Sequence, residues 1–281
     1  MSKSSIYISR AIGDDVLTHR MASQYITKHM VLPDSIHQIA SEVFFRETKI
    51  RSVTWPQTLK VIGARTFFHC SALKTIQLPD STCRIGSGAF SECTSLETVV
   101  LPSSLRVIES DLFAQNRSLK NVIFPADSRV SQIRSAAFLE CYSLESISLP
   151  KGLRLIDRRA FYRCKELRHV RLPHGLQRIG DAAFYFCGLE ELKLPNTLRE
   201  IGDSAFFRCK SLTHVELPPS VRRIEKWCFH GCDSLQTLTI RHDPEFIGEW
   251  ITNRSTTIRC CRGSAADRYC QENDLPVAYL D

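Results

Sequence analysis

The sequence predicts a β-rich repeat solenoid, and three features of the chain predict it. One 23-residue unit recurs along most of the 281 residues, apolar residues alternate before a proline in each copy, and both ends depart from the unit. A fixed period of this length indicates a stack of similar coils. Successive marker prolines are separated by 23, 23, 23, 23, 25, 23, 22 and 23 residues, and they are Pro33, Pro56, Pro79, Pro102, Pro125, Pro150, Pro173, Pro195 and Pro218.

Each part of the unit predicts one element of a coil. The unit reads L-P-x-x-L-x-x-I-x-x-x-A-F-x-x-C-x-x-L-x-x-I-x. Apolar alternation before the proline is typical of a half-buried strand, which the proline ends because it has no N–H to donate. L-x-x-I-G predicts a second short extended or turn segment. A-F-x-x-C-x-x-L has spacings compatible with a short helical or 3₁₀ turn.

A single coil cannot bury these apolar side chains, so the coils must stack. The 23-residue period lies in the range of leucine-rich repeats. We therefore expect a right-handed leucine-rich-repeat solenoid, an α/β-type but β-rich fold, with a parallel concave sheet and terminal caps.

The array is predicted to form one continuous domain with a cap at each end. Residues 1–32 form an N-terminal cap with a degenerate repeat, because IGDDVL at 12–17 matches the repeat segment IGDSAF and places Leu17 at the phenylalanine position. Residues 33–255 form the solenoid of about nine coils, and residues 256–281 form the C-terminal cap. Such caps are needed because an uncapped solenoid exposes its core.

The C-terminal cap is expected to contain a short helix and a strand. Ser264 is placed to cap a helix through about Asn273, and a strand follows at Val277–Leu280.

The repeat also resembles a known family. The unit A-F-x-x-C-x-x-L-x-x-I-x-L-P, preceded by I-G-x-x-A-F, is similar to the BspA-like leucine-rich repeats of bacterial and protist proteins over residues 30–250. The tail G-S-x-A-x-x-Y-x-x-E-N at 263–273 is also typical of that family. The resemblance implies a repeat scaffold, and characterised members are often surface proteins that bind other proteins or host components. This chain differs from them in showing no evident secretion signal.

Seven of the twelve cysteines occupy one repeat position, three residues after the recurring phenylalanine. Free cysteine behaves as a small buried hydrophobe, so recurrence at one position favours a structural ladder. A disulfide is opposed by the parallel directions of the side chains, and a zinc site by a straight row that cannot surround one ion. The ladder comprises Cys70, Cys93, Cys141, Cys164, Cys187, Cys209 and Cys232.

Five cysteines lie outside the ladder. Cys228 stands where other repeats have alanine, so we expect it to pack in the core, and Cys83 is near a turn. Cys260, Cys261 and Cys270 cluster near the C-terminus, where we expect an ordinary cap core with one exposed thiol.

Residues that flank the central apolar position of the first strand face away from the core. They form two variable stripes, which predict a binding surface for another protein or peptide on the concave sheet. Cross-strand pairing of opposite charges is the structural alternative. The candidate residues are an apolar pair, Val100 and Ile123, and a mixed-charge group, His169, Arg171, Glu191, Lys193, His214 and Glu216.

A basic stripe precedes the second segment of each coil. Lys60, Arg106, Arg154, Arg199 and Arg222 are candidates for contact with an anionic partner. No aromatic stacking pattern interleaves with them, and nucleic-acid motifs are missing. The alternative is a solvated face whose long side chains cover the coil with their stems.

Enzymatic function has little support in the sequence. The chain lacks P-loop, G-x-G-x-x-G, G-x-S-x-G and H-E-x-x-H motifs, so we expect no catalytic residue, cofactor, metal or small-molecule substrate. The net charge of +7 permits an anionic partner without requiring one. No apolar run is long enough for a transmembrane segment. We expect a monomer that is cytoplasmic if the chain is complete, and surface-bound or secreted if a signal peptide was removed.

Overall fold

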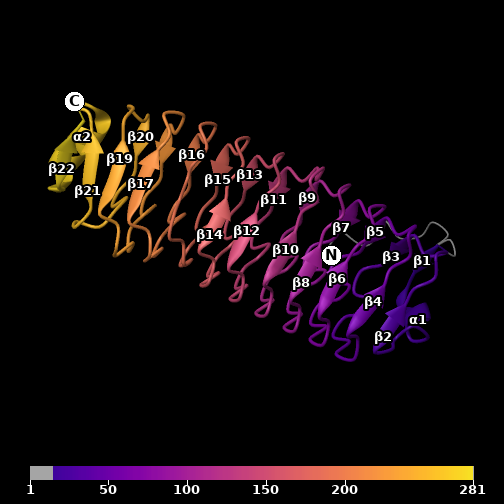
Figure 1. Cartoon of the computed structure of the whole chain (residues 1–281). Helices are drawn as coiled ribbons and strands as arrows, with labels where there is room; N and C mark the ends of the chain where they lie inside the picture. The colour runs from indigo at the N-terminus through magenta and orange to yellow at the C-terminus, as the bar shows by residue number, and fades with distance from the viewer. Residues whose placement is uncertain (1–14, 281) are drawn as a thin grey trace, which may run out of the picture.

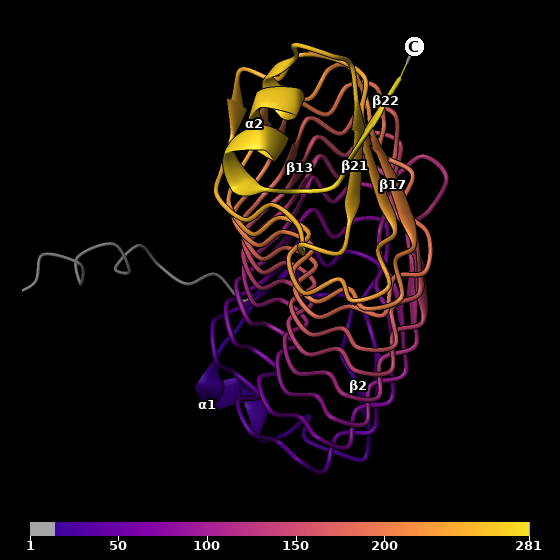
Figure 2. The same ribbon diagram turned by 90° about the vertical axis from the view of Figure 1, so that its left-hand side faces the viewer.

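Each coil contributes one strand to each of two opposite faces of an elongated stack. The computed structural model describes residues 15–280, and the strands follow one another along the stack in chain order (Figure 1). Seen toward its C-terminal end, the coils lie over one another as flattened loops (Figure 2). The predicted β-rich parallel solenoid is therefore confirmed.

The first face carries the longer strands, and we call it the main-strand face. These strands pair in parallel and in register, but they form four separate sheets, β2-β4, β10-β8-β6, β12-β14 and β17-β19-β21-β22. The main strands are β2 (His29–Val31), β4 (Ser52–Thr54), β6 (Thr75–Gln77), β8 (Thr98–Val100), β10 (Asn121–Ile123), β12 (Ser146–Ser148), β14 (His169–Arg171), β17 (His214–Leu217), β19 (Thr237–Ile240), β21 (Thr257–Cys260) and β22 (Val277–Tyr279).

The opposite face carries two-residue strands, and we call it the minor-strand face. The second extended segment of the unit is thus a strand, and its ladders join four strands at one end and seven at the other. The minor strands are β1 (Val16–Leu17), β3 (Gln38–Ile39), β5 (Val61–Ile62), β7 (Arg84–Ile85), β9 (Val107–Ile108), β11 (Gln132–Ile133), β13 (Leu155–Ile156), β15 (Arg178–Ile179), β16 (Glu200–Ile201), β18 (Arg223–Ile224) and β20 (Phe246–Ile247).

The A-F-x-x-C segment forms consecutive turns, so the predicted helical or 3₁₀ turn is wrong. In the coil of Phe161, Arg159 and Arg163 both have positive φ values, 56° and 60°. Left-handed residues at this spacing interrupt any right-handed helix. The bonds within the segment alternate with bonds to the next coil, as Tyr162 N donates to Arg159 O at 3.0 Å and Phe161 N donates to Ala183 O at 2.8 Å.

The core is a row of stacked phenylalanine rings that runs between the two faces. Nine rings, one for each coil from Phe44 to Phe229, are fully buried, and neighbouring ring centroids lie 5.0–6.0 Å apart. Offset stacking at this separation is favourable. Recurrence of one aromatic residue at one repeat position therefore builds a continuous core.

The first coil differs from its sequence-based alignment. Leu17 pairs with Ile39, and its carbonyl oxygen accepts from Ala40 N at 3.0 Å, as Ile39 O accepts from Gly63 N at 2.8 Å. Leu17 therefore occupies the isoleucine position, not the predicted phenylalanine position. A short helix, α1 (His19–Ala22), follows it, and residues 12–14 of the matched segment lie outside the described residues.

The predicted helix and strand of the C-terminal segment are confirmed. The helix α2 (Ala265–Asn273) begins after Ser264, whose hydroxyl accepts from Asp267 N at 3.2 Å. The strand β22 then pairs with β21, and α2 covers the end of the stack (Figure 2). Among residues 15–280, no helix has the length and apolar character required to span a membrane.

Candidate functional site

The apolar pair predicted on the main-strand face is brought together by the ladder. Val100 of β8 and Ile123 of β10 are register partners. Ile123 is 47% exposed, which is high for a large apolar side chain, and Val100 is half-buried. The two residues form a small apolar patch on the central part of this face.

The predicted charged residues are all exposed on the same face, further toward the C-terminus. Their ion pairs are few and exposed. Lys193 lies 3.9 Å from Glu191 of the same segment, and Arg241 Nε lies 2.9 Å from Glu216 Oε1. Arg171 has no carboxylate within ion-pair distance in the part of the chain that the structure describes. Exposed pairs of this kind contribute about 0–1 kcal/mol, so stability does not account for the charged group.

The two histidines of this group differ in their contacts. His214 Nδ1 lies 2.8 Å from Thr237 Oγ1 of the next coil, which holds the ring across two main strands. His169 has no side-chain hydrogen bond within residues 15–280. It is the first residue of β14, two residues before Arg171.

One coil of this region has no main strand because it is one residue short. In this short coil (residues 173–194), only Gly188 separates Cys187 from Leu189, where other coils have two residues between these positions. Residues 191–194 do not form a strand, and the main sheet is interrupted between β14 and β17. The sheet is also divided at β4/β6 and β10/β12, but among the coils of residues 15–280 a main strand is lost only here.

Glycine is required at the point of shortening. A Cβ at Gly188 would lie 2.4 Å from the carbonyl oxygen of Lys165 in the preceding coil. The backbones of the two neighbouring coils are therefore too close together here for any residue with a side chain at position 188. The minor strands on the opposite face remain paired, β15 with β16, so the irregularity is confined to the main-strand face.

The short coil leaves backbone groups unpaired on both of its sides. In complete ladders the residue after the main strand donates to the next coil, as Leu149 N does to Arg171 O at 3.4 Å. The equivalent bonds from Leu172 N to Lys193 O and from Leu194 N to Glu216 O are missing within residues 15–280. Residues 191–194 take part in no backbone hydrogen bond to either neighbouring coil among these residues.

A groove with an apolar floor follows the first of these interruptions. We call it the β14 seam; its volume is about 370 Å³, and it is lined by His169, Val170, Arg171, Leu172, Glu191 and Lys193. Val170 and Leu172 are only half-buried, whereas the central residues of β12 and β17, Ile147 and Val215, are 4% and 2% exposed. Ligand sites of proteins occupy about 300–1,000 Å³, so the seam lies within that range.

The second interruption is also hollowed. A groove of about 310 Å³ separates residues 192–194 from β17 and includes Glu216 and Arg241. Four of the six predicted charged residues, His169, Arg171, Glu191 and Lys193, line the β14 seam, and Glu216 lines this second groove. The proline spacing of 22 residues was the only sequence signal for the two grooves.

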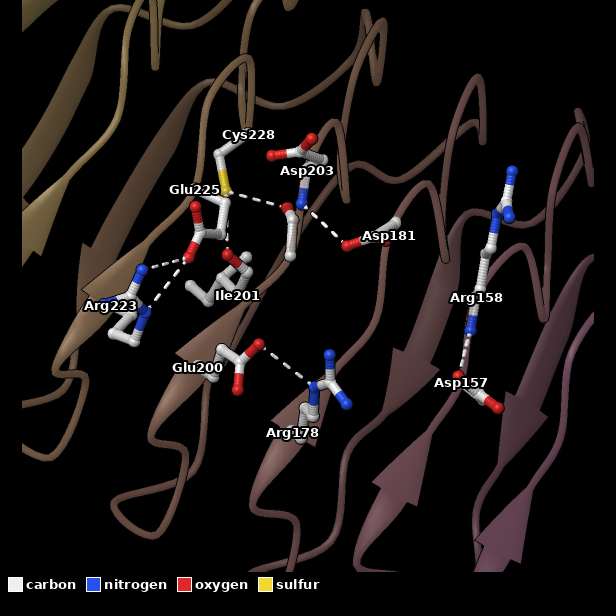
Figure 3. A network of polar contacts seen from close by, with 11 residues as sticks. Asp157, Arg158, Arg178, Asp181, Glu200, Ile201, Asp203, Arg223, Glu225 and Cys228 are labelled. Atoms are coloured by element: carbon white, nitrogen blue, oxygen red, sulfur yellow. Dashed lines mark hydrogen bonds and ion pairs between the residues drawn. The ribbon is translucent and has the colours of Figure 1, made fainter.

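The predicted basic stripe lies beside the minor strands. All five residues are exposed, and Arg222 lies 3.5 Å from Glu245. Lys60, Arg106, Arg154 and Arg199 have no carboxylate within ion-pair distance in the described chain. The adjoining arginines are neutralised, Arg178 by Glu200 at 3.1 Å and Arg223 by Glu225 at 2.9 Å (Figure 3).

An aromatic stripe on the turns was missed by the sequence analysis. It occupies the position after the core phenylalanine, where Tyr162, Tyr185 and Phe207 stack at 4.8 and 5.0 Å. Arginines lie over its rings, as Arg159 does over Tyr162 at 5.6 Å. Recurrence of aromatic residues one place after the core phenylalanine was the signal that could have revealed it. The main and minor strands do not contribute to this stripe.

The ladder cysteines are buried, and their thiols share one hydrogen-bond partner. Each thiol lies 3.1–3.2 Å from the carbonyl oxygen of the phenylalanine in the preceding coil, as Cys209 Sγ does from Phe184 O at 3.2 Å. Asn116 keeps the bond in its coil, with Nδ2 2.9 Å from Phe90 O. The position therefore holds a small buried donor.

Burial keeps the ladder thiols protonated. It raises the pKa of Cys70, Cys164 and Cys232 to about 12, and it also raises that of Cys209 well above its usual value. Thiolates are the reactive form of cysteine, so this ladder is unsuited to nucleophilic chemistry. Cys83 and Cys261 are the exposed thiols among the described residues.

The described residues contain no group of three or more His, Cys, Asp or Glu side chains arranged to hold a metal ion. One groove of about 410 Å³ lies on the turns between Phe68 and Leu139, away from both predicted stripes, and another of the same volume lies at β4 and β6 on the main-strand face. The residues predicted to bind a partner thus gather at the short coil, apart from the Val100–Ile123 pair.

Comparison with known proteins identifies the repeat. The family model for the BspA type leucine-rich repeat region matches the chain in six copies, over residues 21–138 and 131–259. No curated protein matches the chain.

Solved structures show the same arrangement of coils. A leucine-rich repeat protein from Bacteroides ovatus is 22% identical, with a TM-score of 0.55 over 90% of this chain and 84% of that chain. The leucine-rich repeat protein of T. pallidum is 31% identical, with a TM-score of 0.54 over 58% of this chain and 77% of its own. The pneumococcal vaccine antigen PcpA is 18% identical, with a TM-score of 0.50 over 90% and 79% of the two chains.

Proposed function

Because this chain belongs to the BspA-type leucine-rich repeat family, we propose that it is a non-catalytic scaffold that binds another protein through its main-strand face. Repeat solenoids present extended surfaces on which variable residues are held by a constant frame. Here the constant residues are buried and the variable ones are exposed.

The main support for the proposal is the β14 seam. It combines half-buried apolar residues, a cation without an ion partner in the described chain and one histidine, His169, on the main-strand face. Binding energy at protein interfaces concentrates in such central apolar and arginine contacts. The Val100–Ile123 pair extends the same face by a second apolar contact point.

Charge reversal tests this assignment. The double variant Arg171→Glu/Lys193→Glu should weaken capture of the native partner at least about tenfold, equal to about 1.4 kcal/mol, because both side chains line the seam. The measurement is the affinity of the purified chain for the partner that the wild type captures from its native source.

A matched control changes the same number of charges on the opposite face. Arg154→Glu/Arg199→Glu alters two exposed residues of the basic stripe and should leave capture within about twofold of the wild type. If this control loses the partner and the seam variant keeps it, the basic stripe is the binding surface and the main-strand assignment is wrong.

A further inference from the structure

We propose that the groove on the turns between Phe68 and Leu139 binds an arginine side chain of a partner protein. The groove has a volume of about 410 Å³, and it interrupts the aromatic stripe, so we call it the turn gap. It lies away from the main-strand face, and a site there is a second contact surface beyond the function proposed above. The gap supplies a ring face, an apolar floor and a carboxylate, which together fit a guanidinium group.

Two small residues create the turn gap. Ser91 and Ala114 occupy the position after the core phenylalanine, and both are buried. Other coils carry a ring at this position, as Phe68 and Tyr162 do. Where the stripe is complete, neighbouring rings lie 4.8–5.1 Å apart, so two missing rings leave two such spacings. A planar group stacked on a ring occupies one spacing, and the gap is therefore wide enough for a side chain.

Phe68 forms one wall of the gap and leaves a ring face open. One face of its ring stacks on Phe45 at 5.1 Å. The opposite face is directed along the stack toward Ser91, whose side chain is too short to cover it. Guanidinium groups stack favourably on such faces. Ala114 and Leu139 continue the gap as an apolar floor, which suits the methylene stem of an arginine.

Asp111 supplies a carboxylate without a cation. It lines the gap, and no basic side chain lies within ion-pair distance of it in the described chain. The residues at its position in the neighbouring coils, Gly88 and Ala136, carry no charge. Partial burial raises the pKa of the Asp111 carboxyl above its usual value. A cation at this point would offset part of that cost of burial.

The other charged groups of the gap already have partners. Arg65 Nη1 lies 3.2 Å from Glu42 Oε1, and His69 Nδ1 lies 3.0 Å from Glu92 Oε2. Asp111 therefore gives the gap an uncompensated negative charge, and charge complementarity favours a cation as its occupant. A lysine would meet the charge but presents no planar group to the open ring, whereas an aromatic residue would leave the carboxylate unpaired.

The chain itself uses this combination of groups beside the gap. Arg65 pairs with Glu42. Its Cζ atom also lies 4.9 Å from the centres of both the Phe45 and Phe68 rings. In the turn gap the ring and the carboxylate are present, but Gly88 stands at the repeat position of Arg65. A partner's arginine would supply the missing cation.

Restoring the missing rings should close the gap. The double variant Ser91→Phe/Ala114→Phe places rings at a repeat position that holds rings in other coils, so we expect it to fold. The control is His230→Phe, which adds a ring at the same repeat position outside the gap. A thermal melt of each variant shows whether it is folded.

The probe is a phage-displayed library of random twelve-residue peptides. The library is first depleted on the gap-filled variant, which removes peptides that bind elsewhere, and is then selected on the immobilised full-length chain. We expect the enriched peptides to share an arginine. A synthetic form should bind the wild type and His230→Phe equally, and the gap-filled variant at least about tenfold more weakly. Fluorescence anisotropy measures these affinities.

Two changes of charge keep the test valid if the gap-filled variant misfolds. Asp111→Asn removes the carboxylate with little change in shape, and it then replaces the gap-filled variant in the depletion. Citrulline in place of the peptide's arginine keeps the planar shape and removes the charge. We expect each change to weaken binding at least about tenfold. The control Asp127→Asn, at an exposed acid outside the gap, should leave binding within about twofold of the wild type.

The proposal is overturned if the library yields no peptide that binds the wild type and is lost by the variants. Enriched peptides without a shared arginine would also overturn it. So would equal binding of the arginine and citrulline forms, or unchanged binding to Asp111→Asn.

The outcome is independent of the function proposed for the main-strand face. The selected peptide should bind Arg171→Glu/Lys193→Glu as tightly as the wild type, because that variant leaves the turn gap unchanged. Loss of the peptide by that variant would place it at the β14 seam and contradict the turn-gap proposal. Loss of the native partner alone would bear only on the main-strand face.

Discussion

Cysteine at the recurring ladder position acts as a buried hydrogen-bond donor as well as an apolar residue. Its thiol reaches the phenylalanine carbonyl of the preceding coil in all seven cases, and Asn116 preserves that bond. Sequence recurrence predicted the burial, but it did not identify the acceptor, because the acceptor lies 25–28 residues earlier in another coil.

Two substitutions at Cys209 separate packing from hydrogen bonding. Cys209→Ala removes the sulfur and the bond to Phe184 O, and should lower the free energy of unfolding by about 1–3 kcal/mol. Cys209→Ser keeps a donor of similar size and should lower it less. Chemical denaturation of both variants supplies the comparison. A greater loss for serine than for alanine would show that the position is purely apolar.

Repetition made most elements predictable, and the exceptions have local causes. Apolar alternation predicted the strand before each proline, and the periodicity of the unit predicted the second extended segment. The capping residue Ser264 predicted the helix that follows it. The turn was wrongly expected to be helical because side-chain spacing does not report φ, which is positive at two residues of each turn, such as Arg159 and Arg163. Leu17 was misplaced because a similar hexapeptide lies in a different register of the ladder.

The short coil shows how a single missing residue can create a site. Proline spacing revealed the 22-residue coil, and the sequence placed His169, Arg171, Glu191 and Lys193 on neighbouring coils. The open backbone edges were not predictable, since alternation in the segment E-L-K-L still indicates a strand. Whether a strand ladder forms depends on contacts with both neighbouring coils, which no local pattern contains.

Hydrogen exchange in the free protein tests this element directly. Amides of residues 191–194 lack backbone acceptors within the described chain, whereas β19 (Thr237–Ile240) is paired on both sides. We expect the amides of residues 191–194 to exchange at least about tenfold faster than those of β19. Equal protection of the two segments would mean that the ladder continues through the short coil.

At the scale of the whole molecule, one continuous core supports surfaces of different character. The phenylalanine row and the minor strands run on without a break past the short coil, so the frame stays intact where the main-strand face opens. The minor-strand face carries the paired arginines Arg178 and Arg223 (Figure 3). It also carries the cations of the basic stripe that have no carboxylate within ion-pair distance in the described chain. The main-strand face carries the seam. Fold and stripes followed from the repeat, whereas the grooves beside the short coil required the structure.

The most direct test of the account is a hydrogen-exchange footprint of the chain bound to its captured partner. The account predicts slower exchange on binding at β14 and residues 191–194, with little change at the minor strands β13 (Leu155–Ile156) and β15 (Arg178–Ile179) on the opposite face. Slower exchange confined to the minor-strand face, with β14 and residues 191–194 unchanged, would contradict it.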